Sequence, residues 1–127
     1  MGSKKAIATS EASQPGGAYS QAIATEQFIF AAGQVASDPV AGEPASTLED
    51  QVGKAIDNLE AVLRAAGVGL SEVVKTTCFL ADIRDFEKFN ECYKRRFPQP
   101  MPARSTMGVA LADNILVEIE AVALRAS

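Results

Sequence analysis

The sequence predicts an α+β fold in which one mixed six-stranded β-sheet carries two helices on one face. Six short runs are rich in β-favouring residues, and two longer segments place apolar residues at three- and four-residue steps. Their order is strand, strand, strand, helix, strand, helix, strand, strand, which makes two crossover connections of the kind that parallel strands require. At 127 residues the chain fits one domain, residues 1–127.

The strand predictions depend on residue type and on the turns between strands. The six predicted strands cover residues 5–9, 19–24, 28–35, 73–81, 103–110 and 115–124. Residues 28–35 give the clearest strand because β-favouring side chains occupy both faces. Residues 13–17 and 37–45 contain the Gly and Pro typical of loops, and residues 112–114 form the turn between the last two strands.

The first helix is predicted to begin at a capping box, in which Ser46 and Glu49 satisfy each other's free amides. Gly67 is the predicted stop. Gly53 lies inside this helix, where Gly costs about 1 kcal/mol relative to Ala, and tight packing is the expected reason for it. The apolar residues at helical spacing are Leu48, Val52, Ala55, Ile56, Leu59, Val62, Leu63 and Ala66.

The second helix is shorter and follows Asp82 or Asp85, either of which can serve as its N-cap. Pro98 and Pro100 end it. Its predicted buried side consists of Phe86, Phe89, Tyr93 and Phe97.

Two helices cannot cover both faces of the sheet. Along residues 28–35 both alternating sets of side chains are apolar, so the second face also needs burial. The expected cover is another copy of the chain.

Composition excludes several classes of function. The net charge is -4, and the densest basic cluster is Lys94, Arg95 and Arg96, which argues against a nucleic-acid surface. No apolar run approaches the roughly 20 residues that span a bilayer, so a membrane location is not expected. Cys78 and Cys92 are the only cysteines, which suits free thiols in a reducing, cytoplasmic compartment. Without any His, the chain has no Cys-His dyad, Ser-His-Asp triad or His-containing zinc site.

The residues best suited to chemistry lie between Pro102 and Leu124. Arg104 follows a proline bend that fixes its direction, and a guanidinium offers a planar fork of donors for a carboxylate or phosphate. Glu118 and Glu120 are two apart on a strand, so both project to one face, about 6.6 Å apart. A carboxylate there can orient or deprotonate a water. Structural ion pairs are the ordinary alternative for all three side chains.

These residues also carry a family resemblance. Residues 102–105, Pro-Ala-Arg-Ser, and residues 117–123, Val-Glu-Ile-Glu-Ala-Val-Ala, resemble the signature of the Rid family, the YjgF/YER057c/UK114 proteins that act as reactive-intermediate imine deaminases. The resemblance implies a chorismate-mutase-like α+β fold and a homotrimer with clefts between subunits. Further segments that agree in order and spacing are residues 17–22, 32–35, 74–77, 81–83, 85–86 and 89–91.

The resemblance also implies roles for individual residues. Arg104 becomes the anchor for a substrate carboxylate and Glu120 the residue that places the hydrolytic water, which makes these two the catalytic pair; Glu118 stays structural. The substrate-binding residues that it implies are Tyr19, Ala32, Gly33, Asn90, Arg104 and Thr106.

Ordinary alternatives stay open for three of these binding residues. Tyr19 can be a half-buried ring with a bonded hydroxyl, Asn90 can serve helix packing or capping, and Thr106 is an ordinary strand residue.

The implied reaction is hydrolysis of a short 2-imino acid, such as 2-iminopropanoate or 2-iminobutanoate, to the 2-oxo acid and ammonia. An imine carbon is already electrophilic, so no metal or organic cofactor is implied. Two other functions remain open: a non-catalytic small-carboxylate binder or regulator, and the endoribonuclease or translation-inhibitor activity attributed to some family members. The chain departs from the common family pattern at Ala18, where Pro is usual, at Ala32, where Ser is usual, and in a slightly shorter segment between Arg104 and Glu118.

Overall fold

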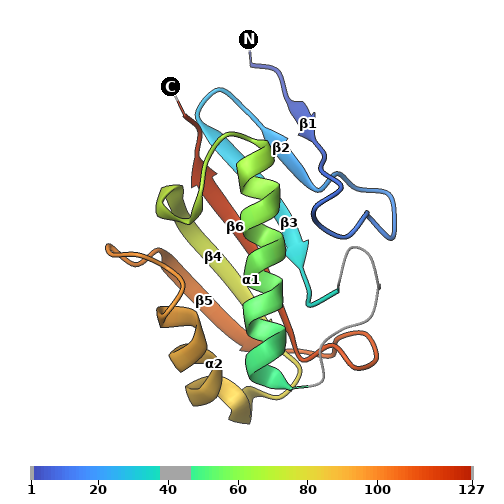
Figure 1. Cartoon of the computed structure of the whole chain (residues 1–127), viewed down its shortest axis with the longest axis vertical. Helices are drawn as coiled ribbons and strands as arrows, with labels where there is room; N and C mark the ends of the chain where they lie inside the picture. Colours follow the sequence, from blue (N-terminus) through green and yellow to red (C-terminus); the bar gives the residue numbers. More distant parts are fainter. Residues whose placement is uncertain (1, 38–46, 127) are drawn as a thin grey trace.

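A computed structural model describes residues 2–37 and 47–126 of the chain. Within them, six strands form one sheet in the order β1-β2-β3-β6-β4-β5. Both helices lie on the same face of this sheet, with α1 running along its middle and α2 beside β5 (Figure 1). The strands are β1 (Lys5–Ile7), β2 (Ala22–Ala24), β3 (Phe28–Gln34), β4 (Val73–Leu80), β5 (Ala103–Gly108) and β6 (Val117–Leu124), and the helices are α1 (Leu48–Ala65) and α2 (Phe86–Lys94).

The predicted α+β class, the element order and the placement of both helices are therefore confirmed. The second strand begins at Ala22 instead of residue 19, so Tyr19 belongs to the loop before it. This loop is held by Gln21, whose buried amide accepts a hydrogen bond from the Thr9 N–H at 2.7 Å and donates to the carbonyls of Thr9 and Ser13. Because the loop is fixed by side-chain bonds, it does not continue the strand ladder.

The last strand of the chain lies between two earlier ones. β6 pairs antiparallel with β3 on one side and with β4 on the other, so β3 and β4 run parallel and α1 crosses over between them. β4 and β5 pair directly in parallel, with α2 as their crossover. This arrangement produces both predicted crossover units and leaves β1 and β5 as the edges of the sheet in one chain.

Thr47 caps α1, since its hydroxyl accepts a hydrogen bond from the Asp50 N–H at 3.2 Å. The predicted partner Ser46 lies outside the described residues. At the other end, Gly67 adopts φ +87° and its N–H donates to the Arg64 carbonyl, so the predicted stop is confirmed.

The expectation that tight packing explains Gly53 is wrong. A Cβ built on Gly53 would meet no heavy atom of residues 2–37 and 47–126 within 4 Å. The Gly53 carbonyl instead accepts a bond from the Arg96 guanidinium, which also pairs with Asp57 at 2.8 Å and so ties the end of α2 to α1. Any residue type would offer the same backbone carbonyl, so this bond does not explain why residue 53 is glycine. Nothing else in the described residues explains it.

The core lies between α1 and the sheet. One face of α1 is buried against alternate residues of β6 and β3, with Val117, Ile119 and Ile29 fully covered. Gln51 is buried on α1 and clamps the turn before β6: its amide donates to the Asn114 carbonyl and accepts from the Leu116 N–H, both at 2.8 Å. Asn114 takes the left-handed φ of 65° that this turn requires.

A 3₁₀ turn, Ile83–Asp85, precedes α2, and Asp82 caps that turn by accepting from the Arg84 N–H. The predicted buried side is correct for Phe89, Tyr93 and Phe97, but Phe86 is 38% exposed. Phe86 opens the first turn of α2.

The second face of the sheet is open in a single chain. Phe30 of β3 lies opposite Val122 of β6, and Phe28 lies opposite Leu124. Phe30 is 45% exposed and Leu124 is 48% exposed, whereas alternate residues of the same strands are buried beneath α1. In the part of the chain that the structure describes, no helix is long and apolar enough to cross a membrane.

Candidate functional site

The register of three strands decides on which face of the sheet each candidate side chain lies. Thr76 of β4 is in register with Arg104 of β5, and its fully buried hydroxyl bonds the hydroxyl of Tyr93 on α2 at 2.7 Å. Arg104 therefore projects to the helix-covered face. The next residue, Thr77, is opposite Glu120 of β6, so Glu120 projects to the open face.

The guanidinium of Arg104 lies among aromatic rings of α2. Its Cζ is 4.7 Å from the ring centroid of Tyr93 and 5.5 Å from those of Phe86 and Phe89. Among the described residues no carboxylate lies within 4.0 Å of Arg104, although Arg84 and Arg96 both have acidic partners. Arg104 is thus a positioned, half-buried cation whose charge no described acid offsets.

Asn90 and Thr106 lie near this guanidinium. Asn90 is four residues after Phe86 and three before Tyr93, so the three side chains share one face of α2. Thr106 is two residues after Arg104 on the same face of β5, in register with the buried Cys78. Its hydroxyl oxygen is buried and has no hydrogen-bond partner among the described residues. A buried hydroxyl without a partner is unfavourable, so a bond to a ligand would stabilise it.

Two other ionisable groups lie near Arg104, Cys78 of β4 and Tyr93 of α2, and neither is a reactive nucleophile. Burial raises the pKa of the Cys78 thiol to about 11, so this thiol stays protonated at neutral pH. Burial also raises the pKa of Tyr93, although its bond to Thr76 acts in the opposite direction. Tyr93 therefore remains a neutral ring beside the guanidinium.

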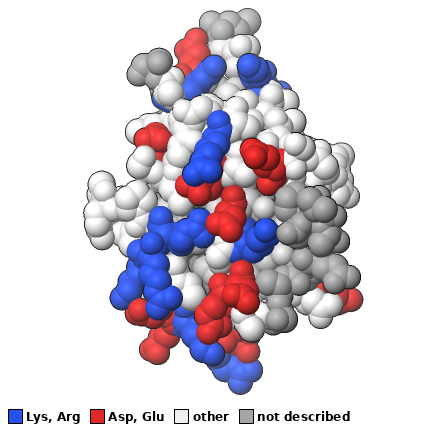
Figure 2. Space-filling view, in the orientation of Figure 1, with Lys and Arg blue, Asp and Glu red and all other residues white. Residues whose placement is uncertain are grey.

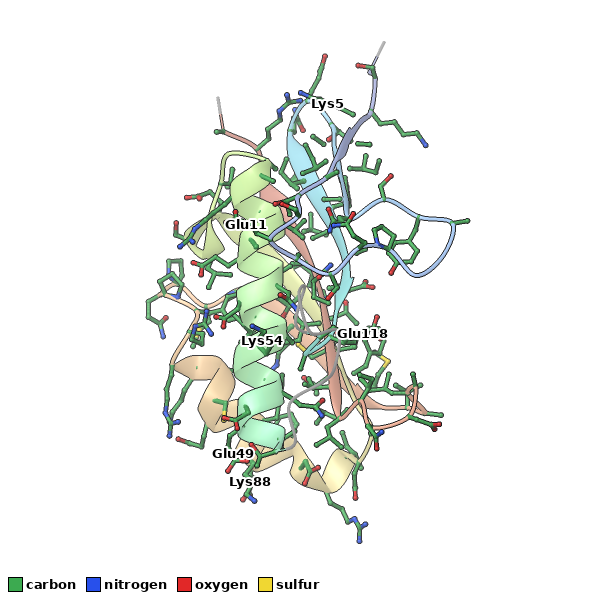
Figure 3. The ribbon with its side chains drawn as sticks, turned by 45° about the vertical axis from the view of Figure 1, so that its right-hand side comes forward. Lys5, Glu11, Glu49, Lys54, Lys88 and Glu118 are labelled. Atoms are coloured by element: carbon green, nitrogen blue, oxygen red, sulfur yellow. The ribbon has the colours of Figure 1, made fainter. Side chains whose placement is uncertain are left out.

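The open face carries both predicted carboxylates. Glu118 and Glu120 project to the same side of β6, as predicted, and Glu118 lies on the side of the sheet turned away from α1 (Figure 3). Burial, followed by the charge of Glu120, raises the pKa of Glu118 above its ordinary value. Glu118 also approaches Gly33 closely: a Cβ on Gly33 would lie only 2.9 Å from its carboxyl carbon.

Gly33 lies where the pairing of β3 with β6 slips, between Ala31 and Gln34. Its missing side chain leaves room for Glu118 of its own chain, which sequence reasoning did not anticipate. Ala32 is half-buried, and its N–H donates to the Gln21 carbonyl at 2.9 Å.

Tyr19 is 54% exposed on the loop before β2. Its hydroxyl accepts a hydrogen bond from the Gly16 N–H at 3.3 Å. The bonded hydroxyl agrees with the ordinary alternative, but Tyr19 is exposed instead of half-buried.

Within one chain the structure brings only part of the predicted site together. Arg104, Asn90 and Thr106 gather between β5 and α2, whereas Gly33 and Glu120 lie on the opposite face of the sheet and Tyr19 on a separate loop. Sequence reasoning missed the rings around Arg104. The signal was present, because Phe86, Phe89 and Tyr93 recur at helical spacing, but such a stripe is typical of core residues.

Comparison with known proteins shows which proteins share this sequence and fold. The family described as endoribonuclease L-PSP matches residues 9–125. A RutC family protein of Pyrococcus horikoshii is 42% identical over 124 residues, covering 96% of this chain and 98% of its own. The 2-iminobutanoate/2-iminopropanoate deaminase of Rattus norvegicus is 42% identical over 125 residues, covering 96% and 90%. The crystal structure of E. coli TdcF with bound serine superposes with a TM-score of 0.89 at 33% identity and covers 96% of this chain and 99% of that one.

The six-stranded sheet backed by two helices is thus a YjgF-like α+β fold, shared with solved structures across almost the whole chain. The chain belongs to the YjgF/Rid family, whose members carry both deaminase and endoribonuclease names. The family resemblance seen in the sequence is confirmed.

Proposed function

We propose that this protein hydrolyses short 2-imino acids, such as 2-iminopropanoate and 2-iminobutanoate, to 2-oxo acids and ammonia. The observation that carries the proposal is Arg104, a guanidinium held in place without a described acidic partner, because such a group suits bidentate binding of a substrate carboxylate. The deaminase name of the 42% identical rat relative supports the same reaction.

The chemistry needs one water and one acid–base group. Glu120 orients a water over the carbon of the protonated imine and accepts a proton as the water oxygen bonds to that carbon. Glu120 then returns this proton to the nitrogen of the tetrahedral intermediate, the C–N bond breaks to release ammonia, and the hydroxyl loses its proton to solvent as the carbonyl forms. Arg104 holds the carboxylate in a fixed plane, so that attack occurs from a defined side. A protonated imine is electrophilic enough that we assign no cofactor to the reaction.

Two copies of the chain are needed to assemble such a site. Arg104 and Glu120 lie on opposite faces of the sheet, and their strands are separated by β4, about 10 Å across two strand spacings. One small carboxylate cannot touch both groups of one chain. The free edge of β5 offers the place where Glu120 of a second copy can face Arg104 of the first.

The open face supports this assembly. Side chains such as Phe30 and Leu124 are about half exposed there. On the same face, burial raises the pKa of Glu118 and so disfavours its charged form. Contiguous apolar surface on a sheet is typical of a contact between copies. We propose the homotrimer that the family resemblance implies, with a site at each contact between subunits.

The remaining predicted residues take supporting roles in this proposal. Thr106 offers its unpartnered hydroxyl and Asn90 its amide on the Arg104 side of the cleft. Gly33, Ala32 and the exposed Tyr19 line the side that carries Glu120.

Release of pyruvate from enzymatically generated 2-aminoacrylate tests the reaction. The native protein is expected to accelerate release above the rate in buffer, and Arg104→Ala to abolish most of the acceleration. Arg84→Ala is the matched control, because Arg84 is an exposed arginine paired with Asp82. If native protein and buffer give the same rate, the protein is not this deaminase.

A second candidate is a non-catalytic binder of small carboxylates. It is favoured by the serine bound to the related TdcF, since serine carries a carboxylate. Binding of 2-oxobutanoate by the native protein, without any imine hydrolysis, would establish it.

The endoribonuclease name of the family provides a third candidate. The helix-covered face gives it little support, because basic and acidic side chains interleave there (Figure 2). Two of the cations on or just after α2 are paired, Lys94 with Glu91 and Arg96 with Asp57. We therefore propose no nucleic-acid partner; RNA cleavage that survives Arg104→Ala would contradict this.

A further inference from the structure

The residues around Arg104 suggest how its guanidinium is held. We define the aromatic platform as Phe86, Phe89 and Tyr93, whose ring centroids lie 5.5, 5.5 and 4.7 Å from the Arg104 Cζ. All three come from α2, whereas Arg104 comes from β5. Three rings around one guanidinium is a specific arrangement, since a single such contact occurs only about once in 70–80 residues of ordinary structure.

The platform contacts the guanidinium without neutralising its charge. Aromatic rings attract a cation through their faces and accept few of its N–H bonds, so the N–H groups stay available to a planar anion. A carboxylate in the same place would hold the side chain equally well but would compete with the substrate. Among the described residues no acid takes that place.

The platform is itself fixed to the strands that carry the site. Tyr93 is almost fully buried, stacks on Phe97 at 4.4 Å between ring centroids, and bonds the Thr76 hydroxyl at 2.7 Å. Thr76 is in register with Arg104 on the neighbouring strand. The position of the ring therefore depends on the same strand pair that sets the position of the arginine.

We propose that Phe86, Phe89 and Tyr93 are positioning residues that hold the Arg104 guanidinium in the orientation that binds a substrate carboxylate. This rests on the proposed function for the identity of the ligand. The platform acts through Arg104 and takes no part in proton transfer. Its loss is therefore expected to weaken carboxylate binding and raise KM while leaving kcat nearly unchanged.

The test measures the Kd of 2-oxobutanoate by titration calorimetry, together with kcat and KM for the imine. Phe86→Leu is the first variant, because Phe86 is partly exposed and its replacement leaves the core intact. We expect Kd and KM to rise about 2- to 5-fold, and kcat to stay within about twofold. Tyr93→Leu should raise Kd about 10-fold or more, and Tyr93→Phe, which keeps the ring, should change it by less than about twofold.

Ile29→Ala is the matched control, since Ile29 is fully buried on β3, which β6 and β4 separate from the strand that carries Arg104. It should leave Kd within about twofold of native even if it lowers the melting temperature as much as Tyr93→Leu does. Arg104→Lys should weaken binding strongly in the native background and much less in Tyr93→Leu, because lysine gains little from the platform.

The outcomes separate the role of the platform from the identity of the reaction. An unchanged Kd in Phe86→Leu and Tyr93→Leu, or an equal loss in Ile29→Ala, overturns the platform. Platform-dependent binding by a protein that hydrolyses no imine keeps the platform and removes the deaminase. If the native protein does not bind 2-oxobutanoate at all, the platform is rejected as a carboxylate-positioning device.

Discussion

The contact between Gly33 and Glu118 gives a prediction that can be worked from distances. In Gly33→Ala the new Cβ would lie 2.9 Å from the Glu118 carboxyl carbon and 3.0 Å from its Cγ. Carbon atoms normally approach to about 3.5–4.0 Å, and the Glu118 Oε2 would lie closer to the new Cβ than either carbon, so the carboxylate must swing away by more than about 1 Å. Overpacking of this kind costs about 1–3 kcal/mol, and the flexible, half-buried Glu118 favours the lower end, about 1 kcal/mol.

The assay is urea unfolding followed by circular dichroism, at one protein concentration throughout, because assembly makes stability concentration-dependent. Gly33→Ala should lower the free energy of unfolding by about 1 kcal/mol in the native background and by less than about 0.5 kcal/mol in Glu118→Ala, which lacks the clashing atoms. Glu120→Ala is the control background, where the full loss should persist. An equal loss in all three backgrounds would show that Glu118 is not what Gly33 accommodates.

Four further predictions concern single residues. Gly53→Ala should stabilise the protein by about 1 kcal/mol, since its Cβ enters open space, whereas Gly67→Ala should destabilise it by about 1 kcal/mol because of the φ of +87°; melting temperatures measure both. Gln51→Ala should cost about 2 kcal/mol, because the buried Gln51 loses its two hydrogen bonds, to the Asn114 carbonyl and from the Leu116 N–H, and chemical denaturation measures it. The raised pKa of Glu118 makes the native state bind more protons than the unfolded state above pH 4.5, so stability falls as pH rises toward the folded-state pKa. Glu118→Gln should flatten that fall in unfolding curves recorded between pH 4.5 and 7.

The elements of the fold were predictable because their signals are local. Helical spacing from Leu48 onward and the stop at Gly67 predicted α1 to within a residue or two, and alternation predicted that Glu118 and Glu120 share a face. The second strand was predicted too long because the Gln21 bonds that fix the preceding loop are contacts between residues eight and twelve apart.

The assembly of the site was not predictable, because it depends on pairing between distant strands. Nothing in the sequence near Arg104 indicates that it is in register with Thr76, which turns it toward Tyr93 and away from Glu120. The same non-local pairing places Glu118 against Gly33. Residue types identified the groups suited to chemistry, whereas the sheet register decides which of them can meet.

The central claim is that each site takes Arg104 from one copy and Glu120 from another. Arg104→Ala chains and Glu120→Gln chains, each nearly inactive alone, can be unfolded together, refolded as a mixture and assayed for imine hydrolysis. Random assembly gives an intact pair at about half times half, or about one quarter, of the contacts, so the mixture should recover about a quarter of native activity. If Arg104 and Glu120 of one chain served the same site, every site in the mixture would lack one of the two groups. A mixture no more active than its separate components would therefore contradict a site shared between copies.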